Sequence, residues 1–399
     1  MSLVTATEHF ERIHRIISVL DEENLKIINT MKKYGPRNLQ QISRKSGVPY
    51  PTVYTRVNKL AGQKLLHTYA YPNFSKIGLA RALVLLTPVA GRELLVREAL
   101  KLPGYWLSII RSSGECNGYY SVHAIPADNR QDFEQYLDQL IPSGLATSYR
   151  IFWLGEYNAV ASFDHFDLKK GVWKFPWASW LRLFLEERKR EKPEDQDSRK
   201  DSFDKNDLLI LKELTKDARK KLSEFARLIG VTLPAAKYRF DNIVRKGLIK
   251  DYIINVLPYA PVISELMEVR LDFKSESLLE AKEKLLQGLP FVMSYSKIRG
   301  ANSITTRIYL PRSELNNLLT LLSTLVRHDI LDRFSYLTLD PMTIENQTFS
   351  YEYYDDESGW SYDNRQYVDS LRKLVSNFEK EEFRIPSFQP GEIAPILVV

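Results

Sequence analysis

The segment GVPYPTVYTRV at 47–57 returns in altered form as GVTLPAAKYRF at 230–240, 183 residues later, with Gly, Val, Pro and Arg at matching places. The same offset joins apolar positions well outside the two segments, including Leu25 with Leu208, Leu60 with Ile243, and Leu65 with Leu248. Self-similarity at one fixed offset indicates that the chain contains one folding unit twice.

After each of these segments, the apolar runs follow the same order. In the first half they predict a strand at 80–88, a helix over 91–102, two strands around a turn at 114–118, a helix at 127–141 and a strand at 146–155. In the second half the corresponding stretches are 265–273, 275–286, the turn at 300–303, 312–326 and 330–338. The order β-α-β-β-α-β is that of a ferredoxin-like plait.

We therefore predict an α+β protein made of two tandem copies. Each copy holds a three-helix, winged helix-turn-helix head, a ferredoxin-like plait, and a trailing amphipathic helix after Trp173 or Trp360. The predicted parts are an N-terminal helix (1–19), the first head (20–70), the first plait with its trailing helix (71–185), a charged linker (186–202), the second head (203–253), the second plait with its trailing helix (254–385) and a C-terminal tail (386–399).

Composition limits the class of protein. With 399 residues, 44% of them hydrophobic, the chain has enough apolar side chains for more than one core. No run approaches about 20 consecutive apolar residues, so neither a membrane span nor a membrane partner is predicted. Acidic and basic residues interrupt the apolar positions of the N-terminus, which favours an amphipathic helix over a signal peptide. A single cysteine, Cys116, excludes an internal disulfide and fits a reducing cytoplasm.

Positive charge is concentrated near the N-terminus. Between Asn24 and Arg92 there are twelve Lys and Arg residues and no Asp or Glu, against a net charge of +6 for the whole chain. Basic side chains on one segment favour a polyanionic partner, because they displace the counterions that condense on phosphates. The alternative is a solvated cationic surface.

The first repeated segment has the pattern of a helix-turn-helix. Gly47 predicts the end of the second helix and Pro51 the start of the third. In that third helix the apolar residues Val53, Val57 and Leu60 share one face. The candidate DNA contacts are Thr52, Thr55, Asn58 and Lys59 on the opposite face, Arg56 on its flank, Tyr50 at its start, and Arg37, Arg44 and Lys45 before it.

The segment FDKNDLLILKELTKDARKKLSEFARLIGVTLPAAKYRFDNIVRKGLIKDY, 203–252, resembles the head of the Lrp/AsnC family of bacterial and archaeal transcription regulators almost along its full length. The segment at 20–69 resembles it nearly as well, and the plaits are similar to that family's effector-binding and dimerising domain. The resemblance implies a sequence-specific regulator that binds double-stranded DNA in the cytoplasm, associated with the nucleoid, as a homodimer or an intrachain pseudo-dimer. The duplication and the trailing helices depart from the family pattern.

The two heads are not equivalent in charge. Candidate contacts in the second head are Lys220, Lys221, Lys237, Tyr238, Arg239, Asn242 and Arg245. Asp241, on the predicted exposed face, would repel phosphates. Our hypothesis is that the first head supplies most of the electrostatic affinity. For the repeated Arg56 and Arg239, the alternative to a DNA contact is a salt bridge within the head.

The resemblance also implies a small-molecule effector at the Gly-led turns of the plaits. In this chain the candidate effector-binding residues of those turns are Gly114, Glu115, Asn117, Gly300 and Asn302. An ordinary hairpin turn is the alternative. The acidic residue expected after the glycine is replaced by Asn117 and Ser303, and Glu115 is the substitute partner for an ammonium group.

We expect no enzyme, no cofactor and no metal site. The six histidines are scattered, and the sequence contains no phosphate-binding loop. Two alternatives remain open. One is a sirohaem-decarboxylase-like enzyme of the same architecture that uses His123 and Arg307. The other is a scaffold that docks on the transcription machinery.

Overall fold

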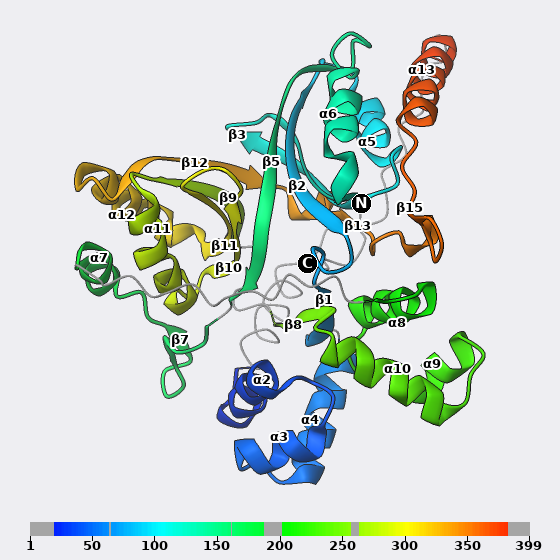
Figure 1. Ribbon diagram of the computed structural model, residues 1–399. Coiled ribbons are helices and arrows are strands. Elements are labelled where there is room, and N and C mark those ends of the chain that lie inside the picture. Colours follow the sequence, from blue (N-terminus) through cyan, green and yellow to red (C-terminus); the bar gives the residue numbers. More distant parts are fainter. Residues whose placement is uncertain (1–19, 64, 161, 187–201, 257–262, 382–399) are drawn as a thin grey trace.

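The computed structural model describes residues 20–381, except 64, 161, 187–201 and 257–262 (Figure 1). Two three-helix heads lie side by side below a strand-rich body, which is covered by helices on its outer faces. The molecule is therefore of mixed α/β class. The predicted N-terminal helix, the C-terminal tail and all of the predicted linker except Glu186 and Ser202 lie outside the described residues.

The first head consists of α2 (Glu22–Tyr34), α3 (Leu39–Ser46) and α4 (Tyr50–Gly62). The Asp21 carboxylate caps α2 by accepting a hydrogen bond of 2.8 Å from the Asn24 N–H. Gly47 ends α3 in the left-handed conformation, as predicted, with φ +74°. The predicted core face of the third helix is confirmed, because Val53, Val57 and Leu60 are all buried.

The second head repeats this arrangement with α8 (Lys205–Lys216), α9 (Leu222–Leu228) and α10 (Leu233–Arg245). Thr232 caps α10, and Gly230 has φ +67° in the preceding turn. Ala236 and Ile243 are fully buried. Phe240 is half-buried, and its ring lies against Arg37 of the first head.

The strand that follows each head pairs with the strand of the other head. β1 (His67–Pro72) and β8 (Ile249–Asn255) form an antiparallel ribbon in which His67 is opposite Asn255. Helix α8 of the second head packs on β1 of the first. The Ala218 N–H donates to the Thr68 carbonyl at 2.9 Å. The heads are thus joined by backbone hydrogen bonds.

The β-α-β-β-α-β order predicted from the sequence is present in each half. In the first it comprises β2 (Leu79–Pro88), α5 (Glu93–Lys101), β3 (Trp106–Gly114), β4 (Gly118–Pro126), α6 (Arg130–Asp138) and β5 (Ala146–Ala159). In the second it comprises β9 (Ser264–Phe273), α11 (Glu276–Lys282), β10 (Val292–Ile298), β11 (Ser303–Pro311), α12 (Leu315–Arg327) and β12 (Leu331–Leu339).

The strands of the two halves join edge to edge on both sides. β5 pairs with β10, and β12 pairs with β3, so four strands from each half close into one antiparallel ring. Apolar side chains such as Leu83, Tyr120 and Leu337 fill the space inside this ring. The short strand β13 (Glu345–Asn346) adds to β3. Closure leaves few unpaired strand edges.

The two predicted trailing helices are present, and each packs on the opposite half. After the hairpin of β6 (Phe166–Asp167) and β7 (Val172–Trp173), helix α7 (Trp177–Leu185) lies against α12. After the hairpin of β14 (Tyr354–Asp355) and β15 (Gly359–Trp360), helix α13 (Asn364–Glu381) lies against α5 and α6. The halves therefore exchange both their head strands and their trailing helices.

Candidate nucleic-acid interface

The polar face of α4 is open to solvent. Thr55, Asn58 and Lys59 are exposed and Thr52 is half-buried, while the opposite face of the helix is buried. Tyr50 and Tyr54, whose ring centroids are 6.2 Å apart, are 42% and 52% exposed. Neither plait nor either trailing helix covers this face in the described part of the chain. The helix presents hydroxyl, amide and ammonium groups together.

Two further predicted cations flank this face. Arg44 and Lys45 lie in the last turn of α3, next to the turn that leads into α4, and both are exposed. The Lys45 ammonium lies 5.6 Å from the centre of the Tyr34 ring. Within the described residues, neither side chain has a carboxylate within 4 Å. Their charge is available to a polyanion.

The structure places Arg56 in ion pairs inside its own head. Its Nη1 lies 2.5 Å from the Asp21 carboxylate and 3.1 Å from the Asn24 amide oxygen, and its Nη2 contacts Glu23. The guanidinium is directed at the start of α2, and not at the open face of α4. The salt bridge within the head, given above as the alternative for Arg56, is therefore present, and a DNA contact by Arg56 stays a prediction.

Arg239 repeats this arrangement in the second head. Its Nη1 lies 2.7 Å from Asp204 and 2.8 Å from Asp207. Burial raises the pKa of Asp207 although Arg239 is beside it. The sequence repeat already indicated this ion pair, because Asp204 and Arg239 stand 183 residues after Asp21 and Arg56. Both repeated arginines thus join the third helix to the first helix of the same head.

Arg37 does not face solvent with the other predicted cations. Its Nη1 donates to the Ala218 carbonyl of the second head at 2.5 Å, and its guanidinium stacks 4.4 Å from the Phe240 ring. Burial lowers its pKa. Arg37 thus forms a contact between the heads, and its phosphate contact stays a prediction. Asn58 takes part in a similar contact, since it accepts a hydrogen bond of 3.0 Å from Arg219.

The open face of α10 is more self-compensated. Tyr238 is 65% exposed, but Lys237 pairs with Asp241 at 3.2 Å and Arg245 donates to the Asn242 amide oxygen. Lys220 is paired with Glu213, whereas Lys221 is exposed. Arg227 was not among the predicted residues. It is the exposed residue of α9 that corresponds to Arg44, and the 183-residue offset points to it.

The two heads differ less in net charge than the absence of Asp and Glu between Asn24 and Arg92 suggests. Residues 20–69 hold nine Lys and Arg and three acids, and residues 203–252 hold twelve and seven, which leaves +6 and +5. The first head's acids, Asp21, Glu22 and Glu23, lie at the start of α2, where Asp21 and Glu23 pair with Arg56, and not on the open face of α4. The asymmetry therefore concerns the recognition face, where Asp241 has no acidic counterpart.

The Gly-led turns of the plaits are ordered by their own hydrogen bonds. Gly114 has φ +104° and donates its N–H to the Asn117 side chain at 3.0 Å, and Gly300 has φ +75°. The Glu115 carboxylate pairs with Arg150 at 2.5 Å and with Arg270 at 3.7 Å. The Asn302 carbonyl accepts from the Phe273 N–H. The Glu115 carboxylate is thus paired with two guanidinium groups of the protein, one from each half.

The fold and this site define a helix-turn-helix protein of mixed α/β class, and comparison with known proteins agrees. The family model described as winged helix-turn-helix DNA-binding matches residues 203–250. The HTH-type transcriptional regulator LrpA of Pyrococcus abyssi is 34% identical over 82 residues, which are 21% of this chain and 58% of LrpA. An uncharacterized HTH-type transcriptional regulator of Pyrococcus furiosus is 32% identical over 109 residues, 27% of this chain and 70% of that protein.

The chain belongs to the Lrp/AsnC family of HTH-type transcriptional regulators. It spans less than two thirds of the length of the two LrpA relatives that it matches. Among solved structures, the siroheme decarboxylase NirDL aligns with 90% of this chain and 100% of its own, at TM-score 0.50 and 11% identity, which is a likeness of fold alone. In the described residues, no helix is both long and apolar enough to cross a membrane.

Proposed function

We propose that the chain is a transcriptional regulator that binds double-stranded DNA by placing α4 and α10 in the major groove. The observation that carries the proposal is the open polar face of α4, whose opposite face is buried in the head core. Threonine, asparagine and lysine side chains on such a face reach base edges and phosphates. DNA binding would place the chain at the nucleoid.

The joined heads support a binding unit built within one chain. We infer that the two halves are tandem copies, with the heads at 20–70 and 203–253 and the plaits with trailing helices at 71–185 and 254–385. The β1–β8 ribbon and the contact between Arg37 and Ala218 hold the heads at one spacing. Such an intrachain pseudo-dimer presents two recognition helices, as a homodimer does, and favours a pseudo-palindromic site.

The test measures the affinity of the full chain for fragments of its own genomic DNA at two salt concentrations. Lys59→Glu should weaken binding about tenfold or more at low salt, because it reverses a charge on the open face. Lys373→Glu makes the same charge change on exposed α13, far from the heads, and is the control. Equal effects of both substitutions would show that net charge, and not α4, governs binding.

We also propose that the first head supplies most of the electrostatic affinity. Arg44 and Arg227 are matched exposed cations on α3 and α9. Arg44→Ala should lower the slope of log affinity against log salt by about 1, the value expected for one phosphate contact. Arg227→Ala should lower it less. A larger effect of Arg227→Ala would assign the dominant role to the second head.

The alternative decarboxylase function finds little support in the residues that suggested it. His123 is fully buried between Phe133 and Ser121, and burial lowers its pKa to about 3, so it cannot carry a proton at neutral pH. Arg307 is paired with Glu268 inside the ring of strands. The relatives are named as transcriptional regulators, and we infer that the chain is not an enzyme.

A further inference from the structure

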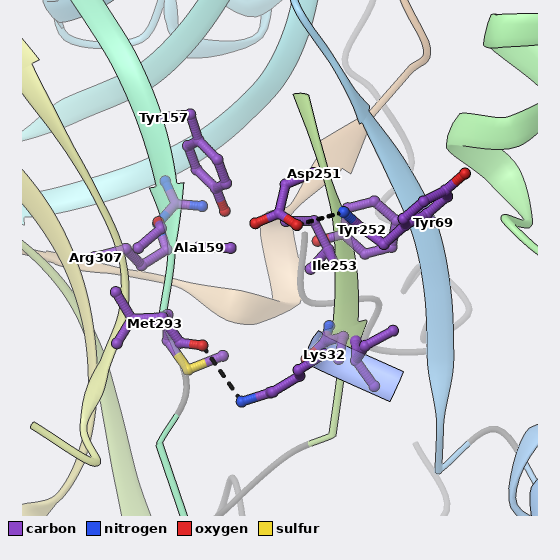
Figure 2. Close-up of a pocket in the computed structure, with 13 residues that line it drawn as sticks. Lys32, Tyr69, Tyr157, Ala159, Asp251, Tyr252, Ile253, Met293 and Arg307 are labelled. Carbon is purple, nitrogen blue, oxygen red and sulfur yellow. Dashed lines mark hydrogen bonds between the residues drawn. The ribbon is translucent and has the colours of Figure 1, made fainter. Parts of the chain in front are cut away.

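A small cavity of about 140 Å³ lies where the first head, the β1–β8 ribbon and the ring of strands meet (Figure 2). Its walls come from α2, from both strands of the ribbon, from the end of β5 and from β10 and β11 of the second half. A wider surface hollow of about 390 Å³ adjoins this cavity and shares Lys32, Tyr157 and Asp251 with it. The cavity therefore touches parts of the molecule that are far apart in sequence.

Lys32 is the residue that the first head contributes to this cavity. Figure 2 shows its side chain entering from the lower side, opposite Tyr157. Its ammonium group lies 3.4 Å from the Val160 carbonyl and 4.8 Å from the centre of the Phe163 ring. Among the described residues, no carboxylate lies within 4 Å of it. A half-buried cation whose nearest partners among the described residues are a carbonyl at 3.4 Å and a ring face is incompletely compensated.

Burial lowers the pKa of the Lys32 ammonium group to about 8, and the more distant carboxylates of Asp164 and Asp251 offset only part of this effect. Lys32 is therefore charged at neutral pH, at a cost that a bound anion would remove. Arg307, on the far wall, is in a different situation. It lies 3.3 Å from Glu268 and 5.0 Å from the Tyr120 ring centre, so its charge is balanced within the ring of strands.

The remaining walls are apolar with a few polar groups. Ile253, Ile254, Met293 and Ala159 supply the apolar surface, and the rings of Tyr69 and Tyr157 border it. An enclosed apolar cavity of about 150 Å³ is large enough for benzene. One incompletely compensated cation beside such a cavity suits one negative charge on a compact hydrocarbon body. A second negative charge would face Asp251.

We propose that this cavity binds a small organic monocarboxylate, with its carboxylate on Lys32 and its hydrocarbon body against Ile253, Ile254 and Met293. The site is separate from the Gly-led turns of the plaits. A ligand here contacts the first head, the ribbon between heads and both halves of the body at once. Its occupancy would therefore bias the position of the heads, a consequence that rests on the proposed DNA-binding function; the binding itself does not.

The test is calorimetric titration of the full chain, without DNA, with benzoate and isovalerate as probes and benzamide as the neutral counterpart of benzoate. Benzoate should bind. Benzamide should bind at least about tenfold more weakly than benzoate, because it lacks the negative charge. Lys32→Met should weaken benzoate binding by a similar factor. Lys33→Met, at the exposed neighbouring position of α2, should leave it unchanged.

Several outcomes would overturn the proposal. These are the absence of binding by both carboxylates, equal binding of benzoate and benzamide, or unchanged benzoate binding in Lys32→Met. If Lys32→Met fails to fold, the benzoate-against-benzamide comparison on the unaltered chain still decides, together with Lys32→Arg, which keeps the charge and should retain binding. Because DNA is absent, failure here leaves the proposed DNA-binding function standing.

Discussion

Single residues show how the repeat maintains each head. Asp21 with Arg56 and Asp204 with Arg239 are the same pair written twice, and each joins the start of the first helix to the recognition helix. The aspartate also caps its helix, so one carboxylate satisfies backbone N–H groups and a guanidinium together. The surroundings of the two pairs differ, because Asp207 in the second head is 8% exposed and replaces Asn24 of the first.

This difference predicts unequal costs of removing the two arginines. Arg239→Met leaves Asp207 buried without its cation and should lower the free energy of unfolding by about 1–3 kcal/mol. Arg56→Met leaves Asp21 and Glu23, each 44% exposed, in contact with water and should cost less than about 1 kcal/mol. Urea unfolding of the two variants measures both values. Equal losses would contradict the role assigned to Asp207.

Lys32 gives a prediction with the opposite sign. Below pH 8 the folded chain buries the charged ammonium at a cost, and between pH 8 and 10.5 the folded chain loses this proton while the unfolded chain keeps it. The free energy of unfolding therefore rises with pH through that window. Lys32→Met removes the cost, and should stabilise the unliganded protein by about 1–3 kcal/mol at pH 7, with a smaller gain toward pH 10.

Urea unfolding of the unaltered chain and of Lys32→Met between pH 7 and 10 measures this gain. The carboxylates of Asp164 and Asp251, the phenols of Tyr69 and Tyr157, and Arg307 are present in both proteins, so their own titration largely cancels in the difference. Destabilisation by Lys32→Met at pH 7 would show that the lysine is a structural residue.

At the level of elements, one matched position of helices α4 and α10 carries an acidic residue only in the second head. Asn58 of α4 corresponds to Asp241 of α10, and both are exposed. Asp241→Asn removes a negative charge from the face that we propose meets DNA, and should strengthen binding about two- to tenfold at low salt. Fluorescence anisotropy with labelled duplex DNA measures the change.

The reciprocal substitution, Asn58→Asp, should weaken binding to a similar degree, and both effects should shrink at high salt. Asp369→Asn on exposed α13 is the matched control, because it makes the same change of charge far from the heads. If Asp241→Asn leaves affinity unchanged, α10 does not approach the phosphates.

The elements themselves were largely predictable, and their partners were not. The strands at 79–88 and 264–273 begin within one residue of their predicted starts, because period-two and period-3.6 patterns are local properties. Nothing local specifies that β5 pairs with β10 or that β1 pairs with β8, since a strand of either half fits either edge. The position of Arg37 against Phe240 follows from that pairing, so the sequence of the first head alone does not indicate this contact.

At the scale of the whole molecule, the two halves depend on each other. The first half gives β1 to the second head and α7 to the second plait, and receives α13 on α5 and α6. Trp360, beside α13, donates its indole N–H to the Ile77 carbonyl of the first half at 2.6 Å, and Trp177 of α7 donates to Glu314 of the second at 2.7 Å. Both contacts thus run from one half of the chain to the other.

This exchange predicts that neither half is stable alone. Residues 20–186 expressed without the rest would expose the edges of β3 and β5 and the faces of α5 and α6, and should self-associate or lose at least 10 °C or so in melting temperature. Residues 203–381 should behave likewise. Mixed in equal amounts, the two halves should form a one-to-one complex that approaches the melting temperature of the full chain, as sedimentation and calorimetry measure.

The control is the full chain cut once within 187–201, which should remain one particle, because the contacts that join the halves come from paired strands and packed helices. Two halves that are each monomeric and as stable as the full chain would show that the closed ring of strands contributes nothing to stability, and would remove the basis for treating the molecule as an intrachain pseudo-dimer.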